Sequence, residues 1–130
     1  MAKGKKRKPK GSDSTRKLLE HAHRGLELMA EHQPRVMGKV QAFMAETMKP
    51  GALDRRAKEQ LALGMAIVQQ CPYCISMHVR SCKASGVTLE EIMEVCSLAV
   101  MMGGGPALTH IAEVERALNE FYLDEEGEVI

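Results

Sequence analysis

The sequence lacks the features that would assign it to a membrane, a secretory route or a bound nucleotide. No uninterrupted apolar run in its 130 residues approaches the roughly 20 that a membrane helix needs. The chain opens with basic residues, but no apolar segment follows them as it would in a signal peptide. It also has no nucleotide-binding fingerprint and no flavin motif. We therefore expect a soluble, cytoplasmic protein without a cofactor, and any electrons must come from another protein or a small dithiol.

A pattern for β-structure is also missing. No stretch alternates apolar and polar residues over the length of a strand, and Val, Ile, Tyr and Phe are sparse. The hydrophobic fraction of 45% is ordinary for a folded protein, and 130 residues suffice for one domain with a single core. The fold class is therefore predicted to be all-α, a bundle of five to six helices.

Capping residues, prolines and glycines divide the chain into these helices. The first should be capped by one of residues 12–14 and end near residue 31, and the last should open at Pro106 and include Phe121. The segment from Leu61 to Val68 is apolar nearly all round, which is typical of a buried central helix. The other predicted starts and stops are Pro34, Pro50-Gly51, Asp54, Gln70, Pro72, Gly86, Thr88 and Met102.

Charge is concentrated at the two ends of the chain. Six of the 18 basic residues lie in the first ten positions, whereas residues 124–128 are mostly acidic. Because such blocks are usually solvated, we predict a basic disordered tail over residues 1–11, a helical domain over 12–123 and an acidic tail over 124–130. A basic arm can hold nucleic acid through phosphates, but this one lacks interleaved aromatic residues, so nucleic acid is not expected as a partner.

The most distinctive chemical feature is the sequence Cys71-Pro72-Tyr73-Cys74 at a predicted helix start. Cysteines at i and i+3 lie on nearly one face of a helix, so their sulfurs can form a disulfide with little backbone movement. The helix N-terminus also favours the thiolate form of cysteine. His78 lies one turn beyond Cys74, where it could accept the thiol proton or stabilise the thiolate as a cation.

Glu59 is the candidate carboxylate for this site, twelve residues before Cys71. If the two helices fold back as an antiparallel hairpin, Glu59 lies level with about residue 82. That is about one turn beyond His78 at ~1.5 Å of rise per residue, a gap that a side chain plus one water can span. Spacing alone leaves two interpretations open for Glu59, a proton relay or an ordinary glutamate at the rim of the surface.

These residues resemble the alkylhydroperoxidase D / carboxymuconolactone decarboxylase family. The resemblance spans about residues 50 to 120 and implies an all-helical fold that assembles as trimers or hexamers. It also implies a redox-active cysteine pair that reduces peroxides or disulfides. The matching motifs are Glu59-x11-Cys71-x-Tyr73-Cys74-x3-His78, Gly86, the Thr88-Leu89-Glu90-Glu91-Ile92 start and Gly103-Gly104-Gly105-Pro106-Ala107-Leu108.

The resemblance also implies a role for each residue of the motif. Cys74 corresponds to the nucleophile that attacks peroxide, and Cys71 to the resolving thiol that closes the disulfide. Glu59 and His78 correspond to the proton relay. Tyr73 stands where alkylhydroperoxidase D itself has a second histidine; with an ordinary pKa of about 10 it is a poorer base, so dithiol chemistry is favoured over efficient peroxidase turnover. Lactone decarboxylases of the family generally lack the cysteine pair, which disfavours that activity here.

Two interpretations of a different class stay open. A zinc site could use Cys71, Cys74, His78 and Cys82, but Cys71 and Cys82 lie ~16 Å apart by helical rise, too far for one ion. A non-catalytic interaction module could use the basic arm instead. As partners we expect a peroxide or disulfide substrate, a protein or lipoyl-type dithiol donor, and further copies of the chain, with a hexamer favoured over a trimer.

The remaining cysteines, histidines and methionines receive structural interpretations. Cys82 and Cys96 are interpreted as small buried hydrophobes, and the ten methionines mainly as core filler. His110 is a candidate to line the active pocket. The other histidines are expected on the solvated side or at the end of the first helix, at His21, His23 and His32.

Overall fold

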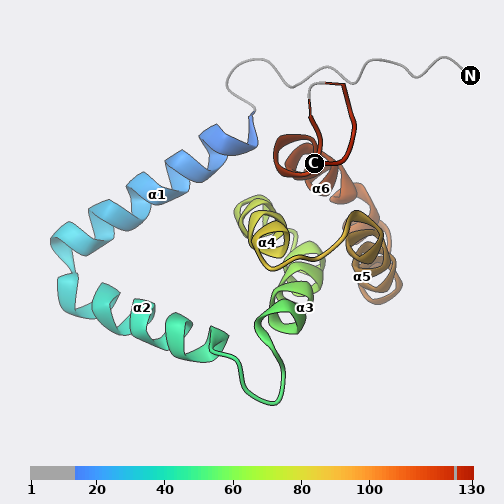
Figure 1. Ribbon diagram of the computed structural model, residues 1–130. Coiled ribbons are helices and arrows are strands. Elements are labelled where there is room, and N and C mark those ends of the chain that lie inside the picture. Colours follow the sequence, from blue (N-terminus) through green and yellow to red (C-terminus); the bar gives the residue numbers. More distant parts are fainter. Residues whose placement is uncertain (1–13, 125) are drawn as a thin grey trace, which may run out of the picture.

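The computed structural model describes residues 14–124 and 126–130, and most of this part of the chain is helical (Figure 1). The only β-pairing in the described residues is an isolated bridge between Leu123 and Val129. The all-α prediction is therefore confirmed, with six helices. They are α1 (Thr15–His32), α2 (Pro34–Met48), α3 (Arg55–Val68), α4 (Pro72–Ala84), α5 (Leu89–Thr109) and α6 (Ile111–Phe121).

The helix starts are capped as the sequence indicates. Ser14 and Asp54 each accept the backbone N–H three residues on, at 3.2 and 2.7 Å. At the start of α5, the Thr88 hydroxyl accepts the N–H of Glu91 at 3.2 Å, and the Glu91 carboxylate accepts the N–H of Thr88 at 2.7 Å, which completes a capping box. The two other candidate caps of α1, at positions 12 and 13, lie outside the described residues.

The last two helices differ from the prediction. The chain does break in the glycine run, where Gly104 has φ 66° and ψ −147°, but Pro106 does not open the last helix. It starts one short turn that ends at Thr109, and α6 begins at Ile111. Glycine is required at two of these positions, because Gly104 has a positive φ and a Cβ on Gly103 would lie 2.7 Å from the Cβ of Ala107.

α5 meets the length and mean-hydropathy criteria of a membrane span, which the sequence analysis did not anticipate. Its 21 residues have a mean hydropathy of 1.4 in the best window. Core helices of globular proteins pass the same test, and α5 packs against α3 and α6, although only 22% of its apolar window is buried. The kink at Gly104 further interrupts the rod that a spanning helix would form.

The core lies among α3, α4, α5 and α6. In Figure 1, α3 stands between α4 and α5, and α4 lies beside α6. The prediction that residues 61–68 are buried all round is only half right. Leu63, Ala66 and Ile67 face the core, but the other side of α3 is exposed and carries Leu61, Met65 and Val68.

α1 and α2 form an arm that continues around the outside of this core (Figure 1). α2 buries only Met37 of its 15 residues. Its apolar stripe of Val36, Val40, Phe43 and Met44 is exposed, with Phe43 71% accessible. The interpretation of the methionines as core filler is therefore wrong for much of the described chain, where exposed ones include Met29, Met44, Met65, Met93, Met101 and Met102.

The segment after α6, which the sequence analysis assigns mainly to an acidic tail, folds back on itself. Ile130 donates its N–H to the Tyr122 carbonyl at 2.9 Å, and Asp124 donates to the Glu128 carbonyl at 2.9 Å. The buried Tyr122 hydroxyl donates to the Val87 carbonyl at 2.8 Å, which ties the end of α6 to the loop before α5.

Candidate active site

The site is built on the hairpin of α3 and α4. α3 ends at Val68, and the chain reverses through Gln70, a non-glycine residue with a positive φ of 58°. Cys71 donates its N–H to the Ala66 carbonyl at 3.2 Å and serves as the N-cap of α4. This tight connection holds the first cysteine where α4 begins and lays α4 directly against α3.

Cys71 and Cys74 are joined by a disulfide, with their Cα atoms 5.3 Å apart. The backbone N–H of Cys74 points to the Cys71 sulfur at 3.3 Å, so this sulfur occupies the acceptor position of a helix N-cap. Both cysteines are half-buried, and Tyr73 between them is exposed. The pair is thus anchored in the helix start yet open to a reactant.

Glu59 and His78 contact each other directly across the hairpin. Nδ1 of His78 lies 2.8 Å from Oε2 of Glu59, so the gap expected from helical rise is closed by the two side chains without water. Glu59 is 1% exposed, and it is no rim glutamate. A carboxylate this deeply buried needs partners for both oxygens, and His78 supplies one of them.

Arg55 supplies the other partner. Its Nε and Nη2 lie 2.9 and 2.8 Å from Oε1 of Glu59, one helical turn away on α3. The Arg55 side chain is 53% exposed and covers the outer side of the buried carboxylate. Arg55 is not among the residues predicted from the sequence, although an arginine four positions before a glutamate on one helix face is a recognisable signal for an ion pair.

Contacts thus link His78, Glu59 and Arg55 in that order, and Cys74 lies one turn before His78 on α4. A sequence profile matches residues 34–117, which is more than half of the chain, and it describes the carboxymuconolactone decarboxylase family. The chain belongs to this family. The match confirms the resemblance to this family that the sequence motifs indicated.

Solved structures of the carboxymuconolactone decarboxylase family have the same fold. A family protein from Legionella pneumophila, in its apo form, is 33% identical with a TM-score of 0.79, over 82% of this chain and 96% of that one. A family protein from Thermotoga maritima, for which a role in an antioxidative response has been suggested, is 26% identical with a TM-score of 0.71, over 78% and 87% of the two chains.

Two curated relatives are themselves uncharacterized. Protein 4 in the cox locus of Paracoccus denitrificans is 41% identical over 70 residues, which cover 54% of this chain and 63% of that protein. A protein of Cupriavidus necator is 26% identical over 95 residues, which cover 73% and 84%. The similarity to these proteins carries no specific activity.

The other two cysteines of this family member are buried and weakly acidic. Burial, with a further contribution from the charge of Glu59, raises the pKa of Cys82 to about 12, and burial raises that of Cys96 to about 11. Their interpretation as buried hydrophobes is confirmed. Within the described residues no three side chains of His, Cys, Asp or Glu gather as metal ligands, so the sequence-derived zinc set is not assembled.

The remaining histidines do not belong to the site formed by Cys71, Cys74, His78, Glu59 and Arg55. His21, His23 and His32 are exposed on α1 as expected, and His23 lies 3.2 Å from Glu27 on the same helix. His110 points Nδ1 at the Pro106 carbonyl at 2.8 Å and caps the turn after the glycine kink.

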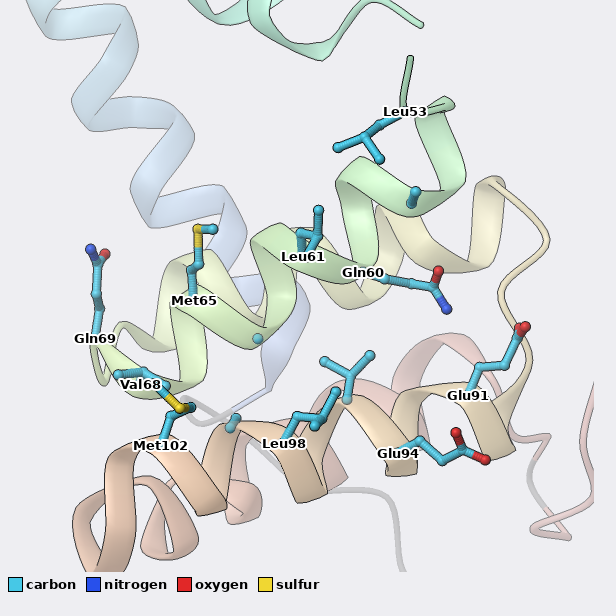
Figure 2. A pocket seen from close by; sticks show the side chains of 14 residues that line it. Leu53, Gln60, Leu61, Met65, Val68, Gln69, Glu91, Glu94, Leu98 and Met102 are labelled. Carbon is cyan, nitrogen blue, oxygen red and sulfur yellow. The ribbon is translucent and has the colours of Figure 1, made fainter. Parts of the chain in front are cut away.

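Away from these residues, a groove lies between α3 and α5 (Figure 2). Its volume is about 830 Å³ and its lining is largely apolar, with Leu61, Met65 and Val68 from α3 and Leu98 and Met102 from α5. Val68 lies beside Met102 at one end of the groove (Figure 2). Gln60, Glu91 and Glu94 give one end a polar character. The buried Glu59 and the cysteines are not among its lining residues.

Proposed function

We propose that the protein is a thiol-dependent oxidoreductase that cycles Cys71 and Cys74 between dithiol and disulfide, with a peroxide or a disulfide as substrate. The observation that carries the proposal is the arrangement of these residues on one hairpin. A half-buried cysteine pair at a helix start is followed, one turn along, by a histidine whose imidazole is paired with a buried carboxylate. Metal-free nucleophilic thiol chemistry needs this combination of a thiolate and a proton acceptor.

The proposed cycle with a peroxide starts at Cys74. His78 takes the thiol proton, the Cys74 thiolate attacks one peroxide oxygen, and the O–O bond breaks as the S–O bond forms. The departing alkoxide takes a proton from His78. The Cys71 thiolate then attacks the sulfenic acid sulfur, which forms the disulfide and releases water after protonation. An external dithiol, from a protein or of lipoyl type, reduces the disulfide by exchange and becomes oxidised itself.

The position of Cys71 supports its role as the resolving thiol. Its sulfur receives the N–H of Cys74 at the N-terminus of α4, an environment that favours a thiolate. The same environment makes Cys71 a good leaving group when a donor thiol attacks Cys74. Tyr73, exposed beside the disulfide, can contribute a hydroxyl to the bound reactant.

Other classes of function fit the site less well. A lactone decarboxylase has no use for a cysteine pair, and a non-catalytic interaction module has no use for a buried carboxylate that holds a histidine. An interaction module remains distinguishable by experiment, because its binding would not depend on the redox state of Cys71 and Cys74.

The proposal also includes partners and location. We expect a homo-oligomer, with a hexamer favoured over a trimer, because α2 and the groove between α3 and α5 leave large apolar surfaces open in a single chain. A cytoplasmic location suits a cysteine pair that must be kept reducible.

The test is a turnover assay with matched variants. Reduced protein is mixed with hydrogen peroxide, with an organic hydroperoxide or with a small disulfide, and dihydrolipoamide serves as the donor. We expect oxidation of the donor to require both Cys71 and Cys74. The buried-cysteine variant Cys96→Ala is the matched control and should keep turnover. Donor oxidation that survives in the double variant Cys71→Ser/Cys74→Ser would rule out the proposed cycle.

A further inference from the structure

The Glu59 carboxylate holds a negative charge at a position that solvent barely reaches, and two groups can balance it. Arg55 contacts Oε1 through both Nε and Nη2, at 2.9 and 2.8 Å. His78 contacts Oε2 at 2.8 Å. A buried carboxylate is strongly disfavoured without a positive partner, so the protonation of this cluster depends on which of the two supplies the charge.

The two possibilities have opposite consequences for His78. If the Arg55 guanidinium balances the carboxylate, the imidazole stays neutral, donates Nδ1–H to Oε2 and keeps Nε2 as a proton acceptor. If Arg55 is absent, the Glu59–His78 pair must take up a proton from solvent. Whether that proton resides on the carboxylate or on the imidazole, the pair has lost its capacity to accept another one from a thiol.

The arrangement favours the first possibility. Both contacting nitrogens of Arg55 go to the same oxygen, Oε1, which leaves Oε2 to the imidazole. Arg55 is always protonated in a protein, whereas histidine changes charge near neutral pH. Cys82 on α4 also senses the charge of Glu59, but its buried thiol is neutral and cannot balance that charge.

We propose that Arg55 is a positioning residue that keeps His78 a neutral base for Cys74. This inference rests on the proposed function for its catalytic meaning. Arg55 does not touch the reacting sulfurs: it acts through Glu59, which in turn fixes the tautomer and charge of His78. The thiol proton of Cys74 passes to Nε2 of His78, and the charge of the Arg55–Glu59 pair does not change in that step.

The neighbouring Arg56 offers a matched control. It also forms an ion pair on α3, but its guanidinium is turned to Glu91 on α5 and to the Gly86 carbonyl at 3.3 Å. The two arginines are adjacent, and both bind a carboxylate. Only Arg55 binds the carboxylate that holds His78, so only its removal should change the imidazole.

The experiment compares Arg55→Met, Arg55→Lys and Arg56→Met in the full chain. For each, the imidazole ¹⁵N shifts of His78 are measured in the reduced protein across pH, together with the rate at which iodoacetamide alkylates Cys74. In Arg55→Met we expect the imidazole ¹⁵N shifts of His78 to differ from those of the wild type, and the alkylation of Cys74 near pH 7 to slow on the order of tenfold. Arg55→Lys should restore most of the difference, and Arg56→Met should match the wild type.

The outcomes separate this inference from the proposed function. Unchanged ¹⁵N shifts and an unchanged alkylation profile in Arg55→Met would overturn it, as would an alkylation rate that rises at low pH. If the wild type has no peroxide or disulfide turnover, the proposed function fails, while the His78 spectrum still decides the role of Arg55. Since Arg55 is half-exposed, its variants should fold; if Arg55→Met does not, Arg55→Gln removes the same charge and is read in the same way.

Discussion

Glu59 and His78 stand 19 residues apart in the sequence, and their side chains meet at 2.8 Å across the α3–α4 hairpin. The contact lies where the carboxylate is almost fully removed from water. In such surroundings electrostatic interactions are stronger than at the surface, so the charge of Glu59 acts on the imidazole with little screening. The pair therefore links the protonation state of His78, on α4 with the cysteines, to the charge of Glu59 on α3.

Replacing Glu59 should slow the chemistry of Cys74 without unfolding the chain. Glu59→Gln keeps the shape of the side chain but removes the charge that orients His78, and losing a positioned base typically costs about 10²–10⁴-fold in rate. The measurement is the rate of sulfenic acid formation in a single turnover, with the thermal unfolding midpoint recorded beside it. Glu46→Gln on α2, in an exposed ion pair with Lys49 just after that helix, is the control and should react like the wild type. A Glu59→Gln variant that reacts as fast as this control would make Glu59 a bystander.

The four cysteines should divide into two classes on alkylation. Cys82 and Cys96 are buried thiols with pKa values raised to about 12 and about 11, so they should not react with iodoacetamide in the folded protein near pH 8. We expect mass spectrometry to find no adduct on the oxidised protein, two after reduction and four after reduction in denaturant. A third adduct on the folded, reduced protein would show that one of the buried thiols opens to solvent.

Cys82 should also make the fold sensitive to alkaline pH. Its folded pKa of about 12 lies above the ordinary value of 9.0, so the folded chain keeps a proton that the unfolded chain releases. The resulting contribution to stability is fully present below pH 9 and is lost as the pH rises from 9 toward 12. Urea unfolding at several pH values should therefore show a smaller alkaline loss of unfolding free energy in Cys82→Ala than in the wild type. Parallel curves for the two proteins would contradict this.

The exposed apolar stripe of α2 should hold copies of the chain together. Light scattering at micromolar concentration is expected to give a mass well above the 14.3 kDa of one chain, with a hexamer favoured over a trimer. Phe43→Glu places a charge in the middle of the stripe and should lower the mass, whereas Lys39→Glu at an exposed position off the stripe centre should lower it less. A monomeric wild type would contradict the prediction.

The local features of this fold could be predicted because each depends on a few neighbouring residues. Asp54 caps α3, Thr88 and Glu91 form a capping box, and Gly86 has the positive φ expected of a helix stop. The glycine run breaks the chain as expected. The start of α6 was misplaced because the turn from Pro106 to Thr109 depends on how tightly Gly103 packs on Ala107, which no local pattern encodes.

The sequence predicts which residues form the site, but it does not predict which of their side chains touch. Cys71, Cys74 and His78 follow from spacing on one helix, but the distance between Glu59 and His78 depends on how closely two helices pack. Helical rise left a full turn between them, and side-chain reach closed it. Arg55 was missed because exposed arginines are common and only the burial of Glu59 makes this one distinctive. The exposed side of α3 was missed because an apolar pattern does not reveal whether its own chain covers it.

The last prediction assigns the roles of the two sulfurs. Cys71 caps α4, where its sulfur accepts the N–H of Cys74, and Cys74 lies one turn before His78. Both positions favour a thiolate, but peroxide attack also needs a proton donor for the departing oxygen, and only Cys74 has a histidine one turn along its own helix. We therefore expect Cys71→Ser to react once with peroxide and to accumulate a sulfenic acid on Cys74, which dimedone traps.

Cys74→Ser tests the same assignment by removing the proposed nucleophile and keeping the proposed resolving thiol. It keeps the Cys71 thiol and its place at the helix start, so a helix-terminus effect alone would leave peroxide reactivity intact. We expect this variant to react no faster than Cys71→Ser/Cys74→Ser, because without Cys74 no thiol has His78 one turn beyond it. Mass spectrometry locates the dimedone adduct and stopped-flow gives its rate of formation. An adduct on Cys71 in Cys74→Ser, formed at the wild-type rate, would reverse the roles, and it would mean that the helix terminus rather than His78 activates the attacking sulfur.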